Sequence, residues 1–263
     1  MEKKIFMSSI FKSGTWLLRK IVEKLTGMEA YEPPHVPGAP AYGDGGLIEF
    51  VPGHFFSWHS EINENTTRVI RENDAKAILL FRNIYDLALS MYHHLAGDID
   101  SEIGRSTGMA GFFSRFSKDE GLSMVITGVS GPDGFWSGIG PHYAQIEKML
   151  VFSKSYQALP VSYERLCLRK KEEICRIADY LDIPVSTATI DEVAAATDFD
   201  TMKIKAVADG GGSHFRRGEP GGHREALKEQ HIYMIGGQLA NFAPNLWSLS
   251  RELGFGELIQ RLG

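Results

Sequence analysis

The stretch SSIFKSGTW at residues 8–16 joins a short apolar run to a segment with helical periodicity. Between the two lie Lys12, a glycine at position 14, and the hydroxyl side chains of Ser13 and Thr15. In a strand-to-helix loop, backbone N–H groups and the positive end of the helix converge on one point, and a lysine adds a full positive charge there. The stretch therefore predicts a βα unit whose loop binds a phosphate-like group, although an ordinary βα turn with a solvated lysine fits the same residues.

Strand and helix patterns alternate along the rest of the chain. Each predicted strand is followed by a helix, and the three pairs are 4–10 with 15–24, 76–81 with 84–95, and 157–163 with 169–181. Strands that alternate with helices in this way form parallel sheets covered by helices on both faces. The sequence therefore predicts an α/β fold with a central parallel sheet, built as one domain over residues 1–263.

Composition excludes several classes of protein. A formal net charge of −5 argues against general binding to nucleic acid, so any basic site must be local. No apolar run reaches about 18 residues, which predicts no membrane span. Cys167 and Cys175 are expected in one helix, too far apart to form a disulfide. Reduced thiols and the lack of a signal-peptide pattern lead us to expect a cytoplasmic protein.

Two further basic sites accompany the first loop. Arg82 follows the predicted strand at 76–81, at the sheet edge where open α/β folds bind ligands, and Ser90 lies about two helical turns later. The third site is FRRG, which comprises Phe215, Arg216, Arg217 and Gly218. Taken singly, these features are also typical of a surface salt bridge and a solvated basic turn. Together with the loop of Lys12 they predict a ligand with more than one phosphate-like group.

These motifs resemble those of the cytosolic-type sulfotransferases, which use 3′-phosphoadenosine 5′-phosphosulfate (PAPS) and release 3′-phosphoadenosine 5′-phosphate (PAP). FKSGTW resembles their P-loop-like phosphosulfate-binding loop, RNIYDLALSMYHH their 3′-phosphate motif, and FRRGEPGG their C-terminal R-K/R-G motif. VSYERL and TDF resemble further cofactor contacts. The resemblance implies a cofactor site formed by Lys12, Ser13, Gly14, Thr15, Trp16, Arg82, Ser90, Tyr163, Thr197, Phe199, Phe215, Arg216, Arg217 and Gly218.

Two positions depart from the family pattern. Trp16 falls where the family usually has a second threonine, which leaves its role in stacking on adenine open. The family's catalytic histidine usually lies in a sequence such as G-H-L-P, and VPGHFF places His54 there, at the expected mouth of the loop. His59 is the competing candidate.

The resemblance implies in-line transfer of a sulfuryl group from PAPS to a hydroxyl or amine of a small molecule, which we expect to be a secondary metabolite. Lys12 would stabilise the leaving phosphate and His54 would accept the proton of the acceptor, with no metal required. The alternatives are a P-loop-type nucleotide-dependent kinase and a catalytically silent nucleotide-binding protein. We expect neither nucleic acid nor membrane as a partner, and the sequence gives no indication of oligomeric state.

Overall fold

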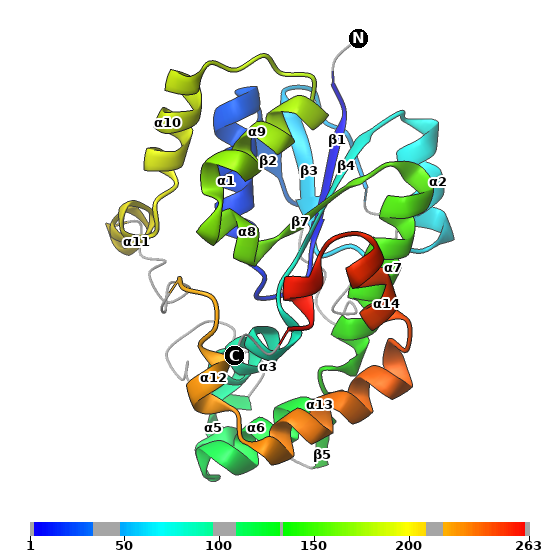
Figure 1. Cartoon of the computed structure of the whole chain (residues 1–263), viewed down its shortest axis with the longest axis vertical. Helices are drawn as coiled ribbons and strands as arrows, with labels where there is room; N and C mark the ends of the chain where they lie inside the picture. The colour runs from blue at the N-terminus through cyan, green and yellow to red at the C-terminus, as the bar shows by residue number, and fades with distance from the viewer. Residues whose placement is uncertain (1–2, 34–47, 97–108, 132–133, 209–217, 261–263) are drawn as a thin grey trace. The chain divides into compact units, whose positions relative to one another are not determined.

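The computed structural model describes residues 3–33, 48–96, 109–131, 134–208 and 218–260 (Figure 1). The chain divides into two compact units, one formed by Met1–Phe81 with Lys148–Gly210 and the other by Arg82–Glu147 with Gly211–Gly263. Each unit is described by itself. The expectation of a single domain over the whole chain stays a prediction.

The first unit is built on a sheet of five parallel strands in the order β2-β3-β1-β4-β7. The strands are β1 (Ile5–Ser9), β2 (Glu29–Tyr31), β3 (His54–Trp58), β4 (Lys76–Phe81) and β7 (Leu159–Ser162). The predicted α/β fold with a parallel sheet is confirmed. The sequence did not predict β2 and β3, because β2 is very short and β3 consists mostly of aromatic residues that follow a proline and a glycine.

Helices cover both faces of this sheet, as predicted. On one face, Met7 and Ile78 belong to an apolar cluster with residues of α1 (Thr15–Thr26), including Ile21, and of α9 (Lys170–Tyr180). On the other face Phe6 stacks on Phe56, with ring centroids 5.5 Å apart. The helices of this unit are α1 (Thr15–Thr26), α2 (Glu64–Glu72), the end of α7 (Gly140–Tyr156), α8 (Tyr163–Leu168), α9 (Lys170–Tyr180), α10 (Thr187–Ala196) and α11 (Phe199–Ala208) (Figure 1).

The two cysteines lie in different helices. Cys167 belongs to α8 and Cys175 to α9, and both are free thiols. The expectation of one continuous helix was wrong because the backbone leaves the helical conformation at Arg169, with φ −134° and ψ 42°. The separation along one helix, which argued against a disulfide, therefore does not apply.

The second unit is mainly helical. Helices α3 (Ile84–Ala96) and α6 (Lys118–Thr127) pack on each other, and α6 also packs on α13 (Glu229–Phe242). A short antiparallel hairpin, β5 (Val129–Gly131) with β6 (Gly134–Trp136), precedes α7. The remaining elements are α3 (Ile84–Ala96), α5 (Met109–Phe113), α6 (Lys118–Thr127), α12 (His223–Ala226), α13 (Glu229–Phe242), α14 (Leu246–Glu252) and η3 (Gly256–Leu258). Among the residues described, none of these or the other helices has the length and apolar character needed to cross a bilayer.

Candidate functional site

The loop that joins β1 to α1 is a tight reversal of the chain. Lys12 and Gly14 both have positive φ angles, 62° and 93°. The buried Ser13 turns its hydroxyl inward and donates a hydrogen bond to the carbonyl of Ile10 at 2.5 Å. Helix α1 then begins directly at Thr15, so its first amide groups, which have no acceptor within the helix, lie beside this loop. Lys12 and the helix N-terminus thus provide positive charge at one point.

The position of the loop follows from the strand order. β1 is the central strand, with β3 on one side and β4 on the other. The chain passes first to β2 and β3 and only later to β4, so the strand order reverses at β1. Open α/β sheets bind their ligands at such a switch point, outside the carboxyl ends of the strands. The residues after β1 therefore occupy the favoured ligand-binding edge of this sheet.

Tyr163 packs directly against Gly14. A Cβ atom added at Gly14 would lie 2.4 Å from Cδ2 and 2.7 Å from Cε2 of the tyrosine ring. The ring itself is buried, at the first position of α8. Glycine is thus required at position 14 both by the positive φ angle and by the ring above it. The structure therefore brings Tyr163 to the loop of Lys12, the two motifs that the sequence proposed for the cofactor.

A chain of polar contacts connects the start of α1 to His59. The hydroxyls of Thr15 and Ser9 are 2.8 Å apart, and the Ser9 hydroxyl lies 3.2 Å from Nδ1 of His59. The same ring nitrogen is 2.8 Å from the backbone carbonyl of Ser9. Because a carbonyl oxygen can only accept, this contact assigns the proton to Nδ1 and leaves the lone pair of the neutral ring on Nε2.

His59 is held in the neutral form. Burial of the ring lowers its pKa from 6.5 to about 4; the hydrogen bond that Nδ1 donates to the Ser9 carbonyl opposes the shift, and the positive charges of Arg19 and Lys12 add to it. The ring also stacks on Phe11, with centroids 3.9 Å apart. A neutral imidazole beside a lysine and a helix N-terminus is an arrangement suited to proton transfer at neutral pH.

His54 does not lie at this loop. It is the first residue of β3, paired with Glu29 of β2, and Nε2 lies 3.8 Å from the Glu29 carboxylate. In the parallel register of β1 and β3, Ser8 is opposite Trp58. His54 is therefore about 13 Å back along the strand, toward the amino edge of the sheet. The predicted position of His54 at the mouth of the loop is wrong, and the histidine found there is the competitor, His59.

Sequence reasoning missed Arg19 and Ser9. Arg19 is buried on α1, donates from Nε to the Ser57 hydroxyl at 2.7 Å, and forms an ion pair with Glu32. Burial lowers its pKa to about 10, and the charge of Glu23 opposes that shift. The signal in the sequence was the position of Arg19 among the apolar residues of the helix, one turn after Thr15.

Trp16, Thr197 and Phe199 are three further residues that the family motifs imply for the cofactor site. Trp16 is 52% exposed, and the Arg19 guanidinium lies 5.5 Å from its ring centroid. Thr197 is buried at the end of α10, where its hydroxyl donates to the carbonyl of Val193 at 2.7 Å. Phe199 is the first residue of α11. The Thr197 hydroxyl thus serves the helix end, and ligand contacts of all three side chains stay predictions.

The second unit contains Arg82, Ser90 and Gly218. Arg82 follows β4 in the chain, and Ser90 is half-buried on α3. The charge of Arg82 acts on Asp86, in the first turn of α3. Gly218 has a positive φ of 71°. Phe215, Arg216 and Arg217 lie outside the described residues.

The comparison with protein families gives one match that covers most of the chain. The model of the sulfotransferase domain matches residues 2–235. A comparison with curated proteins gives no match. Within the described ranges, no group of three or more His, Cys, Asp or Glu side chains is placed to hold a metal ion.

Solved structures of sulfotransferases share the fold. Mouse sulfotransferase SULT7A1 complexed with PAP matches with a TM-score of 0.67 and 18% identity, over 95% of this chain and 89% of that chain. Retinol dehydratase with retinol and PAP matches with a TM-score of 0.59 and 15% identity, over 92% and 83%. The same enzyme with androsterone and PAP matches with a TM-score of 0.58 and 16% identity, over 90% and 80%. At these identities the likeness shows the fold.

Replacing Gly14 by alanine is expected to destabilise the protein by about 1–3 kcal/mol, through the positive φ angle and the collision with Tyr163. Gly53→Ala is the matched control, because Gly53 also has a positive φ, 75°, but nothing lies within 4 Å of its added Cβ. Urea unfolding measures the free energy of unfolding of both variants. A loss at Gly14 no larger than that at Gly53 would show that the Tyr163 ring does not restrict the loop.

The imidazole of His59 is expected to titrate near pH 4 rather than 6.5, as measured by NMR on histidine-labelled protein, with His59→Gln identifying the signal. Since the folded pKa is the lower one, the unfolded chain binds the extra proton between these values. The contribution of His59 to stability is therefore complete above about pH 6.5 and falls as the pH drops toward 4. A titration midpoint near 6.5 would contradict the burial of the ring.

Proposed function

Since the chain belongs to the sulfotransferase domain family, we propose that it transfers a sulfuryl group from PAPS to a small-molecule acceptor with a hydroxyl or amine group. The observation that carries the proposal is the grouping of Lys12, the N-terminus of α1 and the neutral His59 at the carboxyl edge of the parallel sheet. These residues offer an anion-binding point and a base in the same place. The shared fold of the PAP-bound sulfotransferase structures supports the choice of PAPS.

Lys12 and the first amides of α1 act on the leaving phosphate in this proposal. Sulfuryl transfer resembles phosphoryl transfer in that the protein has little covalent work to do, so the rate depends on positioning and on stabilising the charge that develops on the leaving oxygen. The loop is rigid, because the Ser13 hydroxyl donates a hydrogen bond to the Ile10 carbonyl and the Tyr163 ring packs against Gly14. A preorganised cation and helix N-terminus need no rearrangement when that charge appears.

His59 accepts the acceptor's proton in this proposal, in place of His54. Its Nδ1 is occupied by Ser9, which directs the lone pair of Nε2 away from the strand. Its lowered pKa keeps the ring neutral and ready to accept a proton throughout the neutral range. Arg82 and Ser90, with Arg216, Arg217 and Gly218, are proposed to bind the 3′-phosphate, as the family motifs imply.

The acceptor is proposed as a small molecule, with a secondary metabolite as the preferred class. Two of the similar structures hold retinol and androsterone. Phe55 and Phe56 are buried in the core, so for this chain Trp58, half-buried at the carboxyl end of β3 with its ring centroid 6.3 Å from that of His59, is the aromatic residue that favours a partly apolar acceptor. Incubating the protein with PAPS and a panel of phenols, aliphatic alcohols and amines, and measuring PAP release, tests the reaction. Transfer from ATP to the same panel would support the kinase alternative, and binding of PAP without any transfer would support a silent binding protein.

Lys12→Ala is expected to lower kcat by about a hundred- to a thousandfold, the usual cost of removing a group that stabilises developing negative charge. Binding of PAPS should weaken less, because the contribution of the charge is greatest when the phosphate leaves. The control is Lys20→Ala on α1, whose ammonium pairs with Glu23. Steady-state kinetics measures both variants. A normal kcat for Lys12→Ala would remove this residue from the transfer step.

His59→Gln is expected to lower kcat by about a hundred- to ten-thousandfold with a hydroxyl acceptor, while His54→Gln retains the wild-type rate. For the wild type, kcat/KM should stay level as the pH falls through 6.5 and decline only toward the His59 pKa of about 4. The reverse order of the two variants would restore His54 as the base. If neither variant is impaired, the acceptor is already nucleophilic and the enzyme mainly positions it.

A further inference from the structure

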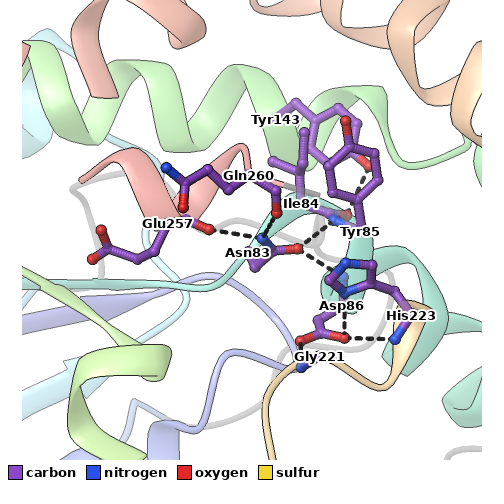
Figure 2. A network of polar contacts seen from close by, with 9 residues as sticks. All are labelled: Asn83, Ile84, Tyr85, Asp86, Tyr143, Gly221, His223, Glu257 and Gln260. Atoms are coloured by element: carbon purple, nitrogen blue, oxygen red, sulfur yellow. Dashed lines mark hydrogen bonds and ion pairs between the residues drawn. The ribbon is translucent and has the colours of Figure 1, made fainter. Parts of the chain in front are cut away.

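The first turn of α3 is fixed by buried polar contacts from segments far away in the sequence (Figure 2). Asn83 accepts hydrogen bonds from the amides of Tyr85 and Asp86, and donates to the carbonyls of Glu257 and Gln260 at 2.7 and 2.9 Å. The Tyr143 hydroxyl of α7 donates to the carbonyl of Ile84 at 3.0 Å. The helix that begins two residues after Arg82 therefore has a defined position within its unit.

Asp86 connects this turn to residues 221–223. One carboxylate oxygen accepts from the amide of Gly221 at 2.5 Å, and the other accepts from the amide of His223 at 3.0 Å and from its Nδ1 at 2.9 Å. The side chains of Asp86 and His223 are each only 1% exposed. A buried carboxylate with three N–H donors holds its partners strongly, because breaking the contacts would leave a charge without compensation.

The charge of Asp86 is maintained at neutral pH. Burial alone would raise its pKa, but the hydrogen bond from His223, the charge of Arg82 and the Gly221 amide together lower it. An uncompensated carboxylate near Arg82 would oppose an incoming anion. The donors from residues 221–223 reduce that repulsion while they fix the chain.

The ring of His223 depends on Asp86 for its orientation. Its Nε2 is buried and has no hydrogen-bond partner among the described residues. The ring also packs near Tyr85, with centroids 5.4 Å apart. The contact from Nδ1 to the carboxylate is therefore the directional interaction that sets the orientation of the ring.

We infer that Asp86 and His223 are positioning residues for recognition of the 3′-phosphate of the nucleotide: they hold residues 221–223 against the helix that follows Arg82. The inference rests on the proposed function. Gly218 and the glycine at 221 both have positive φ angles, 71° and 91°. Because glycine can take many backbone conformations, contacts from other segments help to hold this stretch in one of them. Asp86 provides those contacts from the same turn on which the charge of Arg82 acts.

Calorimetric titration with PAP and with adenosine 5′-phosphate, which lacks the 3′-phosphate, tests the inference. Asp86→Ala and His223→Leu are expected to weaken PAP binding by about tenfold or more and to leave adenosine 5′-phosphate binding within about threefold of wild type. His223→Asn should restore PAP binding, because its amide nitrogen can donate where Nδ1 did. Arg82→Ala provides the reference for a direct loss of 3′-phosphate selectivity.

Lys228→Ala is the matched control, since it removes an exposed ion pair with Asp119 in the same unit. Lys228→Ala should change neither the affinity for PAP nor the affinity for adenosine 5′-phosphate. Thermal unfolding of every variant shows whether a loss of selectivity is caused by a loss of structure. A wild-type protein that does not bind PAP would refute the proposed function and the inference with it. If the wild type binds PAP and the Asp86 and His223 variants lose affinity for both nucleotides equally, or for neither, the inference alone fails.

Discussion

The reversal of the chain between β1 and α1 is the constraint on which the candidate site depends. Lys12 and Gly14 take left-handed backbone conformations, and the ring of Tyr163 occupies the space that a side chain at Gly14 would need. Because the turn is so short, α1 begins beside the end of β1, and the Thr15 hydroxyl reaches Ser9. A longer or looser loop would separate the helix N-terminus from the strand ends.

That proximity determines the charge state of the groups nearby. The positive charges of Arg19 and Lys12 act on His59, and the desolvated, half-buried ring is held neutral. Ser9 contributes its carbonyl and its hydroxyl to one ring nitrogen, which fixes the tautomer as well as the orientation of the ring. Burial is the main reason that the base stays unprotonated, and the positive charges that attract an anionic donor add to this effect, so the two functions support each other.

The second unit uses a similar arrangement at a different helix. The first turn of α3 is held by Asn83, by Asp86 and by the hydroxyl of Tyr143. In both units a helix that follows a strand begins at a position fixed by buried polar groups, which are costly to leave without partners and therefore permit few alternative arrangements. Apolar packing forms the elements, and these contacts define where the helix ends lie.

The sequence by itself determined the parallel α/β fold, the βα units at residues 5–26 and 76–96, and the family, because these follow from local periodicity and from motifs of adjacent residues. It did not determine which histidine lies at the loop. His54 and His59 stand at opposite ends of β3, and only the parallel pairing of β3 with β1 decides which end meets Ser9. The contact of Asp86 with His223 joins residues 137 positions apart. Such contacts depend on tertiary packing, which no local pattern encodes.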